Sequence, residues 1–179
     1  MFLSLVQKRR SIRKFQPKPI EKEKIDTLVE AALRAPSSMG SNPWEFVFVT
    51  DQSLLEKLSR SKQSGSAFVR NAALAVVVCA DPGKSSVWIE DASIASIFVH
   101  LAAESLGLGS CWIQIRERQH DEKKSAEQYI RETLNIPEHL KVEAIIGVGH
   151  PDEQKPPHSK EELQYEKVHL DSYGKPYSR

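Results

Sequence analysis

The chain contains 179 residues, of which 40% are hydrophobic, and this length suits one well-packed domain better than two. Its 25 Lys and Arg residues nearly balance 24 Asp and Glu residues, so the net charge is only +1. No overall field then draws the protein toward nucleic acid or anionic lipid. We expect neither a nucleic-acid partner nor membrane association, and any cationic site must be local.

The sequence indicates neither export nor metal binding. The apolar residues 1–6 are too few for a secretory signal, no small-residue cleavage site follows them, and no later apolar run is long enough to span a bilayer. Cys79 and Cys111 form no C-x-x-C pair, and the six histidines show no metal-binding spacing. We therefore expect a cytoplasmic protein without a disulfide framework or a metal site.

Hydrophobic spacing predicts the elements of the first half in chain order. A short helix opens the chain and ends near Lys8, and a second helix covers about residues 21–34 before Pro36 ends it. Strand-forming residues at 45–50 and a Val-rich run at 72–80 predict two strands of a core sheet, with a short helix around 54–58 between them.

The second half predicts a long apolar helix over 91–106, which begins at Asp91 and is ended by Gly107. Strands are expected at 110–116 and 141–149, on either side of a helix that a capping box opens at Ser125. Because helices and strands alternate without strict β-α-β order, the fold class is α+β.

Beyond His150, prolines and charges replace periodicity. Spaced apolar residues nevertheless remain there: Leu163, Tyr165, Val168, Leu170 and Tyr173. We expect residues 1–157 to form the core domain and residues 158–179 to form a tail that docks on the core or on a partner subunit.

Three short segments carry candidate chemistry. The first, at 9–13, is a cationic cluster around Ser11, and guanidinium groups with a hydroxyl suit a phosphate. Taken alone, it is more often a solvated basic helix end. The second, at 35–46, is a hydroxyl-rich turn that enters a strand, and the third, at 107–113, is a helix stop followed by a strand. Neither of these two segments is specific alone.

In this order and spacing, the three segments resemble the nitroreductase family of FMN-dependent oxidoreductases. The resemblance covers about residues 9–151. It implies a single-domain α+β fold, with a mixed sheet flanked by helices, that works as a homodimer. It also implies that two FMN molecules lie at the subunit interface and that the C-terminal tails embrace the partner.

The resemblance assigns the cationic cluster to the FMN phosphate. Arg9, Ser11 and Arg13 occupy the three positions of the family's R-x-S-x-[RK] element, with Arg10 at its variable position. Lys155, with Lys160 as the alternative, is the candidate for a further phosphate contact after the last core strand.

The resemblance assigns the other two segments to the flavin ring. The second subunit contributes the first of them, and the positions concerned here are Pro36, Ser37, Ser38 and Asn42. This chain has Gly40 where Asn is usual and Asn42 where Gln is usual, whereas Trp44 is expected to be packing.

The strand of the third segment is expected to pass beside the ring through Trp112 and Ile113. A backbone N–H of Gln114 or Ile115 would lie closest to flavin N5, with Ile115 in place of the usual small residue. No protein side chain is expected to act as the catalyst.

The implied activity is hydride transfer from NAD(P)H through non-covalent FMN to a nitroaromatic, quinone or similar acceptor, by a ping-pong mechanism. Two alternatives stay open. The cluster of Arg9 to Arg13 could serve a non-enzymatic anion or nucleic-acid binding module, or the flavin could carry out a reaction other than nitroreduction. The chain has no Walker A, G-x-G-x-x-G or G-x-S-x-G motif, which argues against the commonest nucleotide-binding and acyl-transfer classes.

Overall fold

A four-stranded sheet forms the centre of the molecule, in the order β1-β2-β4-β3 with every neighbouring pair antiparallel. The computed structural model of the chain describes residues 2–177. The strands are β1 (Trp44–Val49), β2 (Leu74–Ala80), β3 (Gly109–Gln114) and β4 (Lys141–Gly149). Strands β1 and β3 are therefore the edges of the sheet.

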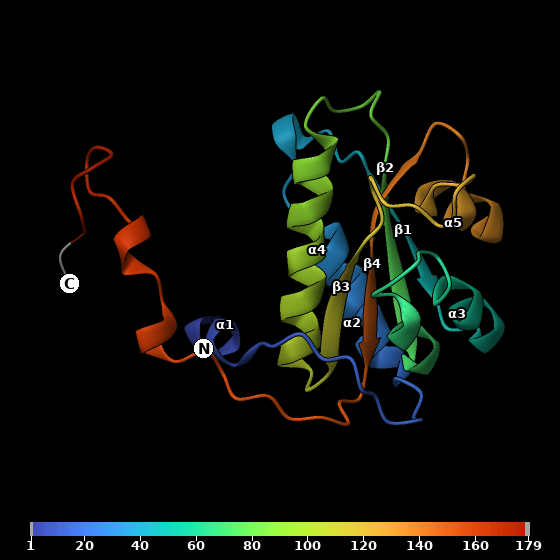
Figure 1. The fold of residues 1–179 in the computed structure, drawn as a ribbon, viewed down its shortest axis with the longest axis horizontal. Helices are drawn as coiled ribbons and strands as arrows, with labels where there is room; N and C mark the ends of the chain where they lie inside the picture. Colours follow the sequence, from blue (N-terminus) through green and yellow to red (C-terminus); the bar gives the residue numbers. More distant parts are fainter. Residues whose placement is uncertain (1, 178–179) are drawn as a thin grey trace.

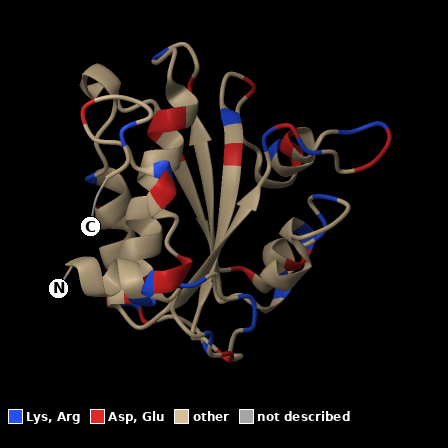
Figure 2. Ribbon diagram, turned by 60° about the vertical axis from the view of Figure 1, so that its left-hand side comes forward, with Lys and Arg blue, Asp and Glu red and all other residues tan. Residues whose placement is uncertain are grey.

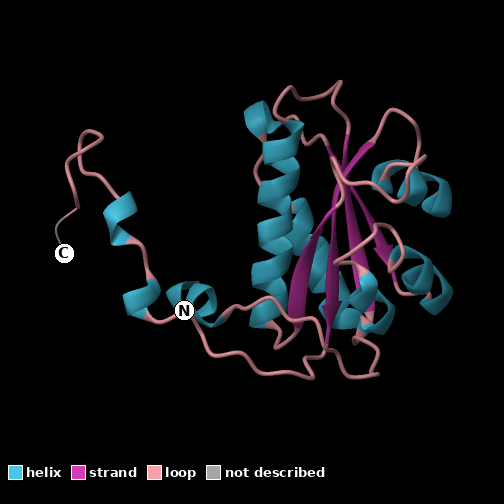
Figure 3. Ribbon diagram, viewed as in Figure 1, coloured by secondary structure: helices cyan, strands magenta, loops and turns pink. Residues whose placement is uncertain are grey.

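Helices cover both faces of the sheet (Figures 1 and 3). One face is packed by α2 (Lys22–Leu33) and α4 (Trp88–Ser105), with α1 (Phe2–Lys8) beside α4. The other face is packed by α3 (Gln52–Leu58) and α5 (Ala126–Leu134). Short 3₁₀ segments complete the fold: η1 (Ser38–Gly40), η2 (Ala67–Asn71), η3 (Lys160–Glu162) and η4 (Tyr165–Lys167).

The period-two geometry of the strands divides the core between the two faces. On β2, Val76 and Val78 pack toward α2 and α4, whereas Val77 packs into the opposite cluster with α3 and α5. Every residue of β2 is buried, as a strand covered on both faces requires. Figure 2 shows charges of both signs spread over helices and loops, while the sheet carries few.

The α+β class is confirmed, with differences in detail. A mixed sheet was expected, but every pair of neighbouring strands in the sheet is antiparallel. Within residues 2–177, the one parallel pairing is an isolated bridge between Ser11 and Ser110. Helix α4 begins at Trp88, one turn before the predicted start at Asp91. Of the expected capping box, the N-cap half is present: the Ser125 side chain accepts a hydrogen bond from the Gln128 N–H, while the Gln128 side chain donates to Glu132 instead.

The C-terminal segment leaves the body of the molecule beyond α1 (Figure 1). Its large side chains remain substantially exposed in the single chain: Leu163, Val168, Leu170, Tyr173 and Tyr177. They are not buried on the chain's own core. In the described part of the chain, no helix has the length and apolar character needed to cross a membrane.

Candidate functional site

The N-terminal segment crosses the beginning of edge strand β3 at very short range. The Ile12 N–H donates to the Ser110 carbonyl at 3.0 Å, and Ser11 forms the parallel bridge to the same residue. A Cβ added to Gly109 would lie 2.8 Å from the Ile12 side chain. Only glycine permits this approach, which brings the cationic cluster onto the sheet edge.

Residues 152–153, about 140 residues later in the chain, hydrogen-bond to the backbone of the cluster. One carboxylate oxygen of Glu153 accepts hydrogen bonds from the backbone N–H groups of Arg13 at 2.5 Å and Lys14 at 3.2 Å. The Asp152 N–H donates to the Lys14 carbonyl at 2.9 Å. The two ends of the chain therefore build one scaffold around the cluster.

Four cations converge on this scaffold. Lys155 Nζ donates to the Ser11 carbonyl at 2.6 Å and lies 3.3 Å from Glu153, and the Arg10 guanidinium donates to the Pro156 carbonyl. No carboxylate within residues 2–177 pairs with the side chain of Arg9 or Arg13. Lys160, the alternative to Lys155, lies in η3 on the extended tail instead.

The buried thiol of Cys111 reports how close these cations are. Burial raises the pKa of Cys111, while Arg13, a hydrogen bond from Ser11, Lys155 and Arg9 act in the opposite direction. Cys111 and Cys79 are both free and buried. The cluster thus lies beside Cys111 at the beginning of β3, and the guanidinium groups of Arg9 and Arg13 have no carboxylate partner among the described residues.

The second half of β3 presents a free backbone edge. The Ile115 N–H donates to the Glu143 carbonyl at 3.1 Å, so this position pairs inward with β4. Because hydrogen bonding alternates along an antiparallel strand, the backbone groups of Trp112 and Gln114 face outward, as those of Ser110 do. Of the two expected donors beside N5, Gln114 has the available N–H, and the N–H of Ile115 is already engaged.

Ile113, which was expected beside the ring, lies on the core side of β3. Its side chain is 1% exposed within the core cluster, and its backbone pairs with Ile145 of β4. Neither part faces the free edge. Ile115 is likewise fully buried in the core, so its size does not narrow the space beside that edge.

Polar side chains hold the end of β3. The Trp112 indole N–H donates to Gln114 Oε1 at 3.1 Å, and Gln114 Nε2 donates to buried Glu143 at 3.2 Å. Arg116 Nε lies 3.1 Å from the other oxygen of Glu143. These contacts hold the Gln114 side chain, and sequence reasoning missed Glu143 because it comes from the neighbouring strand.

The turn over residues 37–42 lies apart from the cationic cluster in the same chain. Figure 1 shows η1 beside the N-terminal end of α4, whereas α1, which leads into the cluster, lies toward the other end. Pro36 is exposed before the turn, and Trp44 packs in a small apolar cluster after it, as expected. One chain therefore keeps its hydroxyl-rich turn away from its own phosphate-type site.

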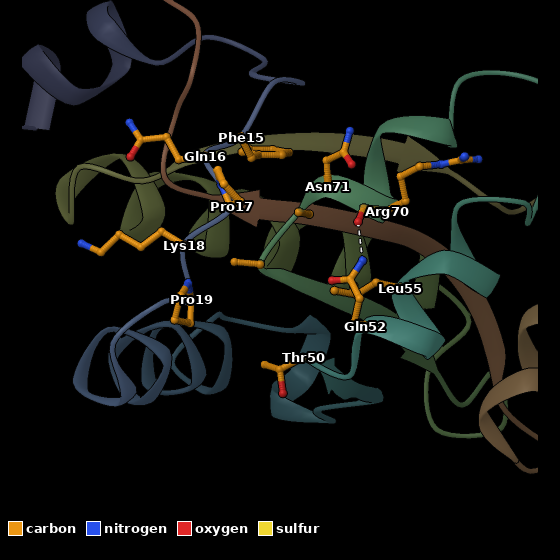
Figure 4. A pocket seen from close by; sticks show the side chains of 12 residues that line it. Phe15, Gln16, Pro17, Lys18, Pro19, Thr50, Gln52, Leu55, Arg70 and Asn71 are labelled. Carbon is orange, nitrogen blue, oxygen red and sulfur yellow. Dashed lines mark hydrogen bonds between the residues drawn. The ribbon is translucent and has the colours of Figure 1, made fainter.

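A separate cavity lies away from the edge of β3. It has a volume of about 630 Å³ and is lined by residues 15–19 and 70–73 together with Thr50, Gln52 and Leu55 (Figure 4). Its cations already have acidic neighbours, since Lys18 lies 3.1 Å from Glu21 and Arg70 lies 3.7 Å from Glu56. The cavity lacks the unpaired cations that mark the edge of β3.

His100 on α4 is a buried structural histidine beside the cluster. Its Nδ1 lies 2.7 Å from the Ser110 hydroxyl. Burial, and secondarily the positive charge of Arg9, lowers the pKa of His100 from 6.5 to about 4. The native protein thus keeps this ring neutral where the unfolded chain would protonate it.

This difference predicts acid destabilisation. The contribution of neutral His100 to the free energy of unfolding is fully present above about pH 6.5. It is lost as the pH falls toward 4, by about 3 kcal/mol in total. His100→Gln should flatten the pH dependence of the free energy of unfolding, measured by urea titration at several pH values. Exposed His139→Gln is the control. Identical pH profiles for His100→Gln and the unmodified protein would contradict the prediction.

Comparison with known proteins agrees with this fold and this arrangement of segments. The Nitroreductase family model matches residues 6–66 and 59–150, which together span the cluster, the turn and the whole sheet. The chain belongs to the nitroreductase family. An FMN-dependent nitroreductase from Clostridium difficile R20291 is 47% identical with a TM-score of 0.94, over 96% of this chain and 99% of that one.

Two other proteins are similar to this nitroreductase-family chain over most of its length. A protein assigned as an NADH dehydrogenase/NAD(P)H nitroreductase in Archaeoglobus fulgidus is 36% identical over 86% of this chain and 87% of its own length. The NADPH:FMN oxidoreductase of Vibrio harveyi, solved with NAD⁺, is 27% identical with a TM-score of 0.81, over 98% and 79% of the two chains. The expected family, fold and oxidoreductase class are confirmed.

Proposed function

We propose that the protein transfers hydride from NAD(P)H, through FMN, to a small oxidised acceptor such as a nitroaromatic or a quinone. The family membership makes it an FMN-dependent oxidoreductase with NAD(P)H as co-substrate. The observation that carries the proposal is the juxtaposition of unpaired guanidinium groups with a free strand edge at β3.

The residues at this edge fit FMN. Arg9, Arg13, Lys155 and the Ser11 hydroxyl suit its phosphate, because forked and charged donors bind phosphate oxygens strongly. The outward N–H of Gln114 suits the polar edge of a flat ring. When bound, FMN supplies the hydride-accepting and hydride-donating chemistry.

The chain itself supplies binding and electrostatics rather than an acid or a base. Arg13 brings positive charge toward the site, which favours a ligand that gains negative charge on reduction. Pairing with β4 orients the outward backbone N–H of Gln114, and the contacts with Trp112 and Glu143 hold its side chain. Pre-oriented donors of this kind cost no rearrangement during the reaction.

We further propose that the working unit is a homodimer, with residues 1–157 as its core and residues 158–179 as an arm on the partner. Apolar side chains lie exposed on α1, α4 and the arm: Phe2, Leu3, Ile97, Phe98, Leu170 and Tyr173. A second copy would cover this surface and bring its 37–42 turn to the cofactor. A cytoplasmic location stays a prediction.

The proposed reaction predicts ping-pong kinetics. If donor and acceptor take turns in one pocket, reciprocal plots at several fixed acceptor concentrations should be parallel. Anaerobic rapid mixing should show two separable half-reactions, with NAD(P)H bleaching the flavin before any acceptor is added. A panel of nitroaromatics, quinones and free flavins, each tested with NADH and NADPH, identifies the substrates.

Two outcomes would contradict the proposal. Converging plots, with bleaching that requires the acceptor, would mean that donor and acceptor bind together. A protein that purifies colourless and gains no flavin absorption on incubation with FMN would favour a non-enzymatic anion-binding module instead.

A further inference from the structure

The 37–42 turn protrudes from the molecule, and a methionine in it adopts a left-handed backbone conformation. Met39 at its tip is 101% exposed. Positive φ angles occur at Met39 (52°), Gly40 (66°) and Asn42 (45°). Glycine and asparagine adopt left-handed backbone angles readily, whereas methionine does so rarely. Contacts within and around the turn must therefore hold Met39 in this conformation.

Part of the constraint is internal to the turn. The Ser37 hydroxyl donates to Asn42 Oδ1 at 2.8 Å, and the Asn42 N–H donates back to the Ser37 hydroxyl at 2.9 Å. These two bonds close the turn end to end. They do not fix its direction relative to the sheet and helices.

An acidic side chain from α4 provides the external anchor. Asp91 is 2% exposed, and its Oδ1 accepts a hydrogen bond from the Ser38 N–H at 2.7 Å across a separation of 53 residues. Its Oδ2 accepts from the Ser85 hydroxyl at 2.7 Å. Ser85 is itself held, since it accepts from the Val87 N–H at 3.3 Å.

This use of an acidic residue differs from ordinary helix capping. An aspartate near a helix N-terminus usually interacts with its own helix, where the free N–H groups favour negative charge. The two residues that donate hydrogen bonds to the Asp91 carboxylate instead lie outside α4, and the N-cap of that helix makes no side-chain hydrogen bond. The carboxylate therefore joins three separate segments of the chain.

We propose that Asp91 is a positioning residue for the flavin site, because it orients the 37–42 turn of one subunit toward the cofactor held by a second copy of the chain. The second part of this inference, that the turn reaches the cofactor of a second copy, rests on the proposed function. The first part, that Asp91 orients the turn, depends only on contacts within one chain. The two parts can therefore be tested separately.

Hydrogen exchange of the flavin-free protein tests the first part. In Asp91→Ala, amide exchange over residues 38–42 should rise about 10- to 100-fold, the size expected when a hydrogen bond to a charged group is lost. Asp91→Asn retains an oxygen opposite the Ser38 N–H and should keep most of the protection. Ser85→Ala removes only the hydroxyl that steadies Asp91, and it should give a smaller increase even if Asp91→Ala does not fold.

FMN titration of the same variants tests the second part. Asp91→Ala should raise the dissociation constant for FMN about tenfold or more, with Asp91→Asn close to the unmodified protein. Glu90→Ala is the matched control, because Glu90 is the exposed acidic neighbour in the same turn of α4.

The outcomes separate the two claims. Unchanged exchange in both Asp91→Ala and Ser85→Ala, or an equal increase in Glu90→Ala, would overturn the anchoring role. Faster exchange confined to the turn with unchanged FMN affinity would support the anchor and overturn its link to the flavin. FMN binding by the unmodified protein tests the proposed function independently.

Discussion

Arg9→Ala and Arg13→Ala should each weaken FMN binding by about 1.5–3 kcal/mol, the range for a hydrogen bond to a charged group. Neither guanidinium pairs with a carboxylate in the described chain, so the substitutions break no ion pair of the native protein. Both face the same anion, and the double variant should therefore lose less than the sum. Fluorescence titration of the apoprotein with FMN measures the loss.

Arg34→Ala is the matched control for these variants. Arg34 is an exposed arginine whose only described side-chain partner is Glu30, one turn earlier on α2. It should leave FMN affinity unchanged. If Arg9→Ala and Arg13→Ala bind FMN as tightly as Arg34→Ala does, the cluster is not the phosphate site.

Ending the chain after Pro157 should convert the dimer to monomer and loosen FMN at the same time. The removed segment carries five exposed large apolar side chains, and burying even two of them on a partner stabilises the dimer by about 3–6 kcal/mol. The dimer dissociation constant should rise by roughly two to four powers of ten. Sedimentation velocity and FMN titration of one preparation measure both effects.

The truncation leaves the phosphate-type cluster intact, because Lys155 and Pro156 precede the cut. Any loss of flavin then reports the missing arm and the partner. Glu166→Ala, an exposed polar change in the same arm, should affect neither property. A full-length protein that stays monomeric at micromolar concentration with FMN bound would contradict the two-subunit site.

Local sequence signals were enough to predict the elements of this fold. The Val-rich run became the fully buried strand β2, and Ser125 caps the start of α5 as expected. The start of α4 was misplaced because an acidic residue normally marks a helix N-terminus. Here Asp91 points to Ser38 and Ser85 instead, and the helix begins one turn earlier.

The site was predictable in outline but not in its contacts. Segment order and spacing placed Arg9, Ser11 and Gln114 in one family pattern. Spacing alone cannot tell which backbone groups of β3 face its neighbour, so Ile113 and Ile115 were included although β4 engages them. Glu143 and Glu153 act across 29 and about 140 residues, and no local pattern in the sequence reports such contacts.

The joining of the two chain ends also sets the order of events during synthesis. Glu153 is among the last residues of the core to leave the ribosome, yet it fixes the backbone of Arg13, which emerges first. Contacts this distant in sequence form late, because most of the chain must be ordered before they close. The cofactor cradle is therefore expected to close late in folding, so that captured flavin marks a chain whose two distant segments have already come together.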